Sequence, residues 1–95
     1  MLFIQVIFSS SIENKAEMEE IREIKREQLS LASGPVKSKM LDIVSDKESG
    51  FSFIMQWNNE DDFDAWFKEI HVGSDGHAKT KHLNIEKTIY RYYEV

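Results

Sequence analysis

The chain has 95 residues, 41% of them hydrophobic and 31% charged, and its net charge is −5. This length predicts a single domain over 1–95. The acidic balance excludes a basic surface for nucleic acid. The absence of cysteine excludes disulfides and thiolate metal sites and is typical of a reducing, cytoplasmic compartment. The apolar start is too short to span a bilayer, so we expect no membrane partner.

The first two predicted elements are a strand over 2–9 and a long helix over 14–31. The strand is apolar on both faces, with Gln5 as the only polar residue in its interior, which is typical of a strand covered on two sides. In the helix, we expect Lys25 on the solvated face. The expected apolar stripe of the helix consists of Met18, Ile21, Ile24, Gln28 and Leu31.

Two further strands are predicted over 36–46 and 51–57, joined by a polar hairpin turn. The second alternates, and its one apolar face consists of Phe51, Phe53, Met55 and Trp57. Asn59 is then a helix N-cap, and Asp62 can reach back to it in a capping box. A helix over 59–70 follows, because one helical stripe contains Phe63, Trp66, Phe67 and Ile70.

A last strand is predicted over 84–95, with Tyr90 and Tyr92 on one side and Ile89 and Tyr93 on the other. The order βαββαβ predicts a ferredoxin-like α+β fold, an antiparallel four-stranded sheet with two helices on one face. No segment remains to cover the second face of the sheet. A second copy of the chain would cover it, so we expect a homodimer.

The segment from Trp57 to Trp66 reads W-x-N-x-x-D-F-x-x-W. It resembles the antibiotic biosynthesis monooxygenase superfamily of small dimeric α+β barrels, which includes the heme-degrading monooxygenases. Members show an aromatic-ended strand, a short turn, an acidic helix start and a Trp inside that helix. The resemblance implies a homodimer joined sheet to sheet. It also implies a monooxygenase-like protein that binds or oxidises a small aromatic or polycyclic ligand without a metal or flavin of its own.

The resemblance implies that Trp66 lines a pocket between the helices and the sheet. The alternative interpretation is a core aromatic, and the two are compatible because such pockets are lined by core aromatics. If Trp66 is fully buried, Trp66→Ala should cost about 3–5 kcal/mol. Further pocket candidates are Gln5 on the first strand, Asp62 one helical turn before Trp66, and Tyr90 in the last strand. Heme-degrading members have an Asn on the first strand, where this chain has Gln5, Val6 and Ile7 and no Asn.

A second hypothesis is heme binding and degradation, with His77 as the axial ligand and Trp66 against the porphyrin. A surface histidine is the alternative interpretation of His77. The spacing of His71, His77 and His82 matches no metal-binding signature, so no metal site is expected. The third hypothesis is a non-catalytic ligand-binding or structural dimer, which the missing Asn on the first strand favours over heme degradation.

Overall fold

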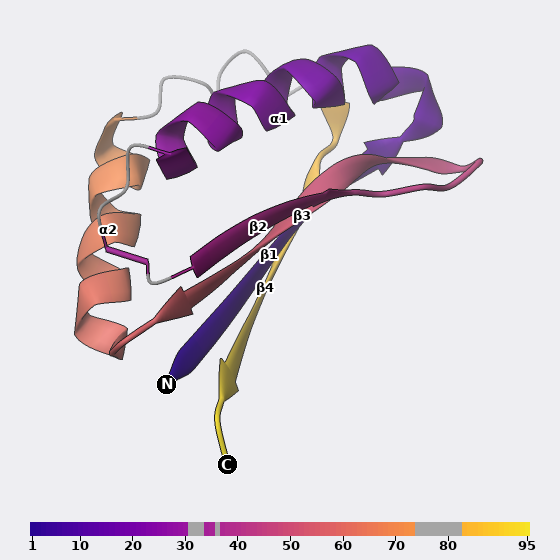
Figure 1. Ribbon diagram of the computed structural model, residues 1–95. Helices are drawn as coiled ribbons and strands as arrows, with labels where there is room; N and C mark the ends of the chain where they lie inside the picture. Colours follow the sequence, from indigo (N-terminus) through magenta and orange to yellow (C-terminus); the bar gives the residue numbers. More distant parts are fainter. Residues whose placement is uncertain (31–33, 36, 74–82) are drawn as a thin grey trace.

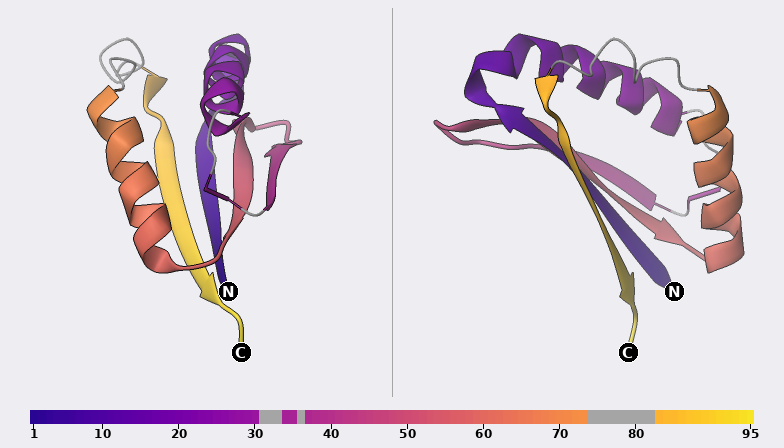
Figure 2. Two further views of the ribbon diagram at one scale, coloured as in Figure 1. Left: turned by 60° about the vertical axis from the view of Figure 1, so that its left-hand side comes forward. Right: turned by 180° about the vertical axis from the view of Figure 1, so that it is seen from behind.

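The computed structural model describes residues 1–30, 34–35, 37–73 and 83–95, with side chains of α2 described as far as Lys68. The elements in chain order are β1 (Leu2–Ser11), a 3-10 turn (Ile12–Asn14), α1 (Lys15–Ser30), β2 (Lys37–Asp42), β3 (Glu48–Trp57), α2 (Glu60–Gly73) and β4 (Glu86–Tyr93). The strands form one antiparallel sheet in the order β2-β3-β1-β4. Both helices lie on the same side of this sheet (Figures 1 and 2). The predicted ferredoxin-like fold is confirmed.

The hairpin between β2 and β3 differs from the prediction. β2 ends at Asp42, and β3 already begins at Glu48, because Ser49 and Gly50 pair with Ser10 and Ser9 of β1. A ladder of backbone hydrogen bonds needs no apolar side chains, so hydrophobic alternation underestimates the length of this strand. For the same reason β1 extends beyond the predicted residue 9 to Ser11. The helix α2 continues past the predicted residue 70 to Gly73, and β4 is shorter than the predicted strand over 84–95.

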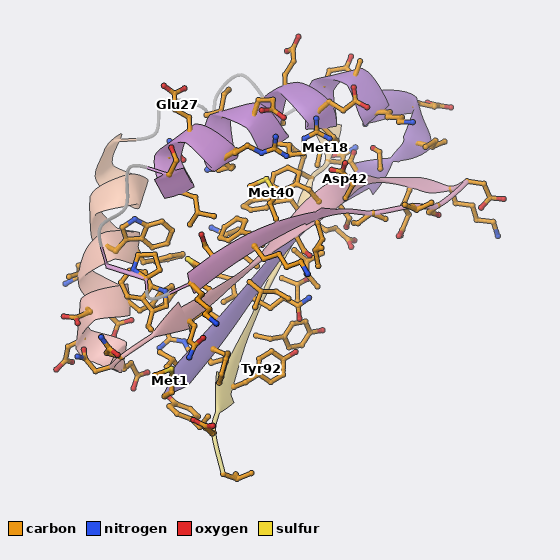
Figure 3. The ribbon with its side chains drawn as sticks, in the orientation of Figure 1. Met1, Met18, Glu27, Met40, Asp42 and Tyr92 are labelled. Atoms are coloured by element: carbon orange, nitrogen blue, oxygen red, sulfur yellow. The ribbon has the colours of Figure 1, made fainter. Side chains whose placement is uncertain are left out.

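The hydrophobic core lies between the helices and the sheet. Burial alternates along β1, so that Leu2, Ile4, Val6 and Phe8 face the helices. Their partners on β3 are Phe51, Phe53, Met55 and Trp57. Met18 and Met40 lie between α1 and the sheet, whereas Tyr92 lies on the side away from both helices (Figure 3).

The buried face of α1 differs from the predicted stripe. Met18 and Leu29 are buried, but Ile24 is 56% exposed, and Lys25 faces the interior instead. The core-facing positions are spaced three, four and three residues apart, at Met18, Ile21, Lys25 and Gln28, which is the repeat of a helical stripe. Ile24 lies next to that stripe. Its apolar character suggested burial, but the rotation of the helix on the sheet exposes it.

Gly50 allows β3 to approach β1 closely. Its φ is +146°, and an added Cβ would lie 2.0 Å from the Phe8 carbonyl oxygen. Gly50→Ala should therefore lower the free energy of unfolding by about 2 kcal/mol, because the backbone conformation and the contact both disfavour a side chain. Chemical denaturation measures this loss. Lys47→Ala on the exposed hairpin is the control and should stay within about 0.5 kcal/mol of the parent. Parental stability of Gly50→Ala would contradict this strand geometry.

Candidate functional site

An aromatic cluster at the junction of β3 and α2 positions Trp66. Its ring centroid lies 5.6 Å from that of Trp57 and 6.3 Å from that of Phe63. Trp57 and Phe63 are each 1% exposed, and their rings meet edge to face at 5.7 Å. Trp66 itself is only half-buried. The cost of about 3–5 kcal/mol expected for Trp66→Ala assumed full burial, and that assumption is not met.

The start of α2 is stabilised by an N-cap residue and by ion pairs with β4. Asn59 Oδ1 accepts a hydrogen bond from the Asp62 backbone N–H at 2.9 Å, so the predicted N-cap is confirmed. The Asp62 carboxylate accepts from the Asn59 side-chain amide at 3.1 Å and is exposed. Arg91 of β4 forms ion pairs with Glu60 and Asp64. Asp62 thus lies at the helix start, where its described hydrogen bonds are those of a cap.

A cavity of about 30 Å³ lies between the two helices and the sheet. We call it the Trp66 cavity. Its lining residues come from β1, β3 and β4 of the sheet and from both helices, α1 and α2. Its lining residues are Val6, Phe8, Lys25, Gln28, Leu29, Phe53, Trp66, Phe67 and Lys87. A mostly apolar lining with a few polar groups is the composition found in small-molecule sites, and the volume of this cavity holds one end of such a ligand.

Three polar side chains reach the otherwise apolar Trp66 cavity. Burial lowers the pKa of Lys25, and burial together with repulsion from Lys25 lowers the pKa of Lys87. Both shifts have the sign expected when an ammonium group leaves water. Gln28 Oε1 is buried and has no hydrogen-bond partner among the described residues. The polar groups of this cavity are therefore suited to a ligand that supplies negative charge and a hydrogen-bond donor.

A larger cavity, of about 250 Å³, lies between the start of α1 and the β2–β3 hairpin. On its wall, Arg22 Nη1 donates to both carboxylate oxygens of Asp42 at 2.9 Å. These charges neutralise one another, and no aromatic side chain lines this cavity. For an aromatic ligand, the smaller Trp66 cavity is the better candidate in spite of its size.

Gln5 and Tyr90 lie on the opposite side of the sheet from Trp66. They are directly paired between β1 and β4, and their neighbours Ile4 and Val6 point to the helices, so the alternation of the strand turns Gln5 away. Tyr92 Oη donates to Gln5 Oε1 at 3.2 Å. The structure therefore does not bring Gln5 or Tyr90 together with Trp66 within one protomer, and their contact with a ligand stays a prediction.

The histidines fall outside what the structure describes. His77 and His82 are not among the described residues, and the side chain of His71 is not described. The role of His77 as a heme ligand therefore stays a prediction. Within the described part of the chain, no group of three His, Asp or Glu residues could hold a metal ion. No helix in that part is long and apolar enough to cross a membrane.

Sequence reasoning did not find Lys25 and Lys87 as cavity residues. The spacing of Lys25 from Met18 and Gln28 could have placed it on the buried stripe of α1. Lys87 offers no such signal, because its position depends on the register that pairs it with Phe8.

No family model and no curated protein sequence matches the chain. Among solved structures, a Deinococcus radiodurans protein described as an antibiotic biosynthesis monooxygenase has a TM-score of 0.68 and 18% identity, covering 100% of this chain and 93% of that one. A variant of MhuD with two manganese protoporphyrin IX molecules per active site has a TM-score of 0.72 and 10% identity, covering 100% and 95%. SnoaB, a cofactor-independent oxygenase from Streptomyces nogalater, has a TM-score of 0.64 and 16% identity, covering 99% and 93%.

The chain has the fold of the antibiotic biosynthesis monooxygenases. A dimeric ferredoxin-like protein from an uncultured marine organism shares it, with a TM-score of 0.67 and 13% identity over 99% of this chain and 98% of that one. The resemblance inferred from the segment between Trp57 and Trp66 is thus confirmed for the fold. Because one fold supports many reactions, the ligand and the chemistry have to be argued from the residues of the Trp66 cavity.

Proposed function

We propose that the protein is a cytoplasmic homodimer of the antibiotic biosynthesis monooxygenase superfamily that binds a small aromatic or polycyclic ligand in the Trp66 cavity and oxidises it without a resident cofactor. The observation that carries this proposal is the place of Trp66. It extends from the aromatic cluster into the one described cavity that combines aromatic walls with polar groups. The likeness to SnoaB supports the cofactor-independent reaction.

The proposed reaction is the oxidation of an activated ring carbon by molecular oxygen. A ring methylene becomes a carbonyl, one oxygen atom enters the product, and the other leaves as water with the two hydrogens of the methylene. The substrate supplies all the electrons, so the reaction balances without an added reductant. The protein then has to bind and orient the ring and exclude water. The aromatic side chains Phe8, Trp66 and Phe67 provide such a surface.

Anthrone, a tricyclic ketone with one oxidisable ring methylene, is the probe for this reaction. The parent protein should take up oxygen and form anthraquinone faster than buffer alone. Trp66→Phe should lower kcat/KM by about tenfold or more, because a smaller ring orients the substrate less well. An oxygen electrode and a thermal melt of each variant separate turnover from stability.

Met55→Leu is the control, because it changes a fully buried side chain that belongs neither to the cavity lining nor to the aromatic cluster around Trp66. It should keep the parental turnover. If the folded Trp66→Phe variant binds and oxidises anthrone as the parent does, Trp66 is a packing residue and not part of the ligand site. Anthrone binding without oxygen uptake would instead support a non-catalytic ligand-binding dimer.

Heme binding is the second candidate function, supported by the likeness to the porphyrin-bound MhuD structure and by a Trp on the cavity wall. If hemin is the ligand, its Soret band should shift on titration with the protein. His77→Ala should then weaken binding and change the band, because the axial imidazole is lost. His71→Ala and His82→Ala are the controls and should leave the spectrum unchanged. Absence of a shift with the parent protein removes this candidate.

The side of the sheet that the helices leave uncovered, here called the open face, is the basis for proposing a homodimer. Register and alternation place on it Phe3, Gln5, Ile7, Leu41, Ile54, Tyr90 and Tyr92. Tyr90 and Tyr92 are 47% and 49% exposed, and their rings stack at 6.2 Å. The same register adds Lys37, Lys39, Gln56 and Thr88, so the apolar side chains form a patch beside polar ones, and a patch of this kind marks an interaction site. A second copy packed sheet to sheet would bury it, and Gln5 and Tyr90 would then be interface residues.

Sedimentation at micromolar concentration should give about twice the mass of one chain. Ile54→Glu should shift the protein to the monomer, because it buries a charge in the centre of the proposed interface. Ile24→Glu makes the same change on the exposed side of α1 and should leave the dimer intact. Circular dichroism shows whether both variants fold. A monomeric parent protein would contradict this proposal.

A further inference from the structure

The Trp66 cavity contains two lysine ammonium groups that lie over the same aromatic ring. Lys25 Nζ and Lys87 Nζ are each 5.6 Å from the centroid of the Phe8 ring. Lys87 Nζ is also 4.9 Å from the centroid of Phe67. The two lysines belong to α1 and β4, and they converge because Lys87 pairs with Phe8 across the sheet. Two positive charges, one on the half-buried Lys25 and one on the exposed Lys87, thus lie over one aromatic ring in a protein whose net charge is −5.

Lys25 is half-buried and has no acidic partner in the described part of the chain. There, the salt bridges of the neighbouring cations on α1 join Arg22 to Asp42 and Arg26 to Glu23. Burial disfavours the charged form of Lys25, and its contact with the Phe8 ring offsets only part of that cost. A cation held in this way gains most from an anion that enters the cavity.

The dimensions of the Trp66 cavity fit the charged end of a ligand. Its volume is about 30 Å³, and a single water requires at least about 10–15 Å³, so it accommodates a group of the size of a carboxylate. Gln28 Oε1, which has no partner among the described residues, would accept from a hydroxyl beside that carboxylate. The surrounding wall, formed by Val6, Phe8, Leu29, Phe53, Trp66 and Phe67, is apolar.

We propose that the Trp66 cavity selects aromatic carboxylates, with one carboxylate oxygen toward Lys25, the other toward Lys87, and the ring extending along Trp66. This inference rests on the proposed function, because it takes the same cavity as the ligand site and names the class of ligand. A carboxylate matches the site better than a neutral ring, since two ammonium groups can each donate to one of its oxygens.

Two probes of the same shape test the selectivity. 1-Naphthoate carries the carboxylate, and 1-naphthamide replaces it by a neutral amide. Isothermal titration calorimetry at neutral pH should show that the parent protein binds 1-naphthoate at least about tenfold more tightly, which is the contribution expected of one hydrogen bond to a charged group.

Lys25→Met and Lys87→Met keep an apolar chain of similar length and remove one charge each. Both should lose most of the preference for 1-naphthoate while they bind 1-naphthamide as the parent does. Arg26→Met is the matched control, because it removes the same charge from the neighbouring, exposed position on α1. It should retain the preference. Lys25→Met should melt at the parental temperature or above, since it removes a partly desolvated cation. If Lys87→Met does not fold, the comparison of Lys25→Met with the parent is sufficient for the test.

The outcomes separate this inference from the proposed function. Equal affinity of the parent for the two probes, or an undiminished preference in Lys25→Met, would overturn the anion selectivity and leave an aromatic-binding cavity. A preference lost equally in Arg26→Met would overturn it as well, because net charge would then explain the effect. Binding of neither probe would overturn both the selectivity and the ligand site at Trp66.

Discussion

The antiparallel pairing of β1 with β3 is the interaction on which the rest of the structure depends. It runs without a break from Leu2 opposite Trp57 to Ser11 opposite Glu48, and the two strands supply most of the buried core. Because side chains alternate along a strand, a slip by one residue would turn this whole set to the other face. The same register brings Trp57 to the start of α2 and places Phe8 under the Trp66 cavity.

The two faces of this sheet differ in their side chains and in what covers them. The face under the helices is apolar along β1 and β3, and its aromatic residues both fill the core and line the Trp66 cavity. The open face combines aliphatic and tyrosine side chains with Gln5 and is left uncovered by the single chain. Residues that are adjacent in sequence, such as Gln5 and Val6, therefore lie on opposite faces of the sheet.

The partial burial of Lys25 beside the Trp66 cavity lowers the stability of the folded protein. Because the pKa of Lys25 is lower in the folded protein than its ordinary value of 10.5, folding carries a cost wherever the lysine is protonated in the unfolded chain, neutral pH included. That cost disappears only above the ordinary pKa, where both states are neutral. Core side chains of the same size without charge would avoid it. Sites that bind charged ligands commonly carry such a cost.

The order of the elements, the antiparallel sheet and the aromatic stripe of α2 could be predicted from the sequence, because they depend on local periodicity. Alternation marks Phe51 to Trp57 as a strand, the spacing of Phe63, Trp66 and Phe67 marks a helix, and Asn59 marks its start. Each of these signals lies within a few residues of the structure that it specifies.

The composition of the site was decided by the tertiary structure. Lys25 and Ile24 are neighbours, and hydrophobicity favours burial of Ile24, but the rotation of α1 on the sheet buries part of Lys25 instead. Gln5 and Tyr90 were expected beside Trp66, yet the pleat of β1 and β4 turns them to the open face. Lys25 and Lys87 meet at Phe8 only through the packing of a helix on one side of a strand pair. No local pattern encodes these contacts, because they join segments far apart in the chain through strand register and helix orientation.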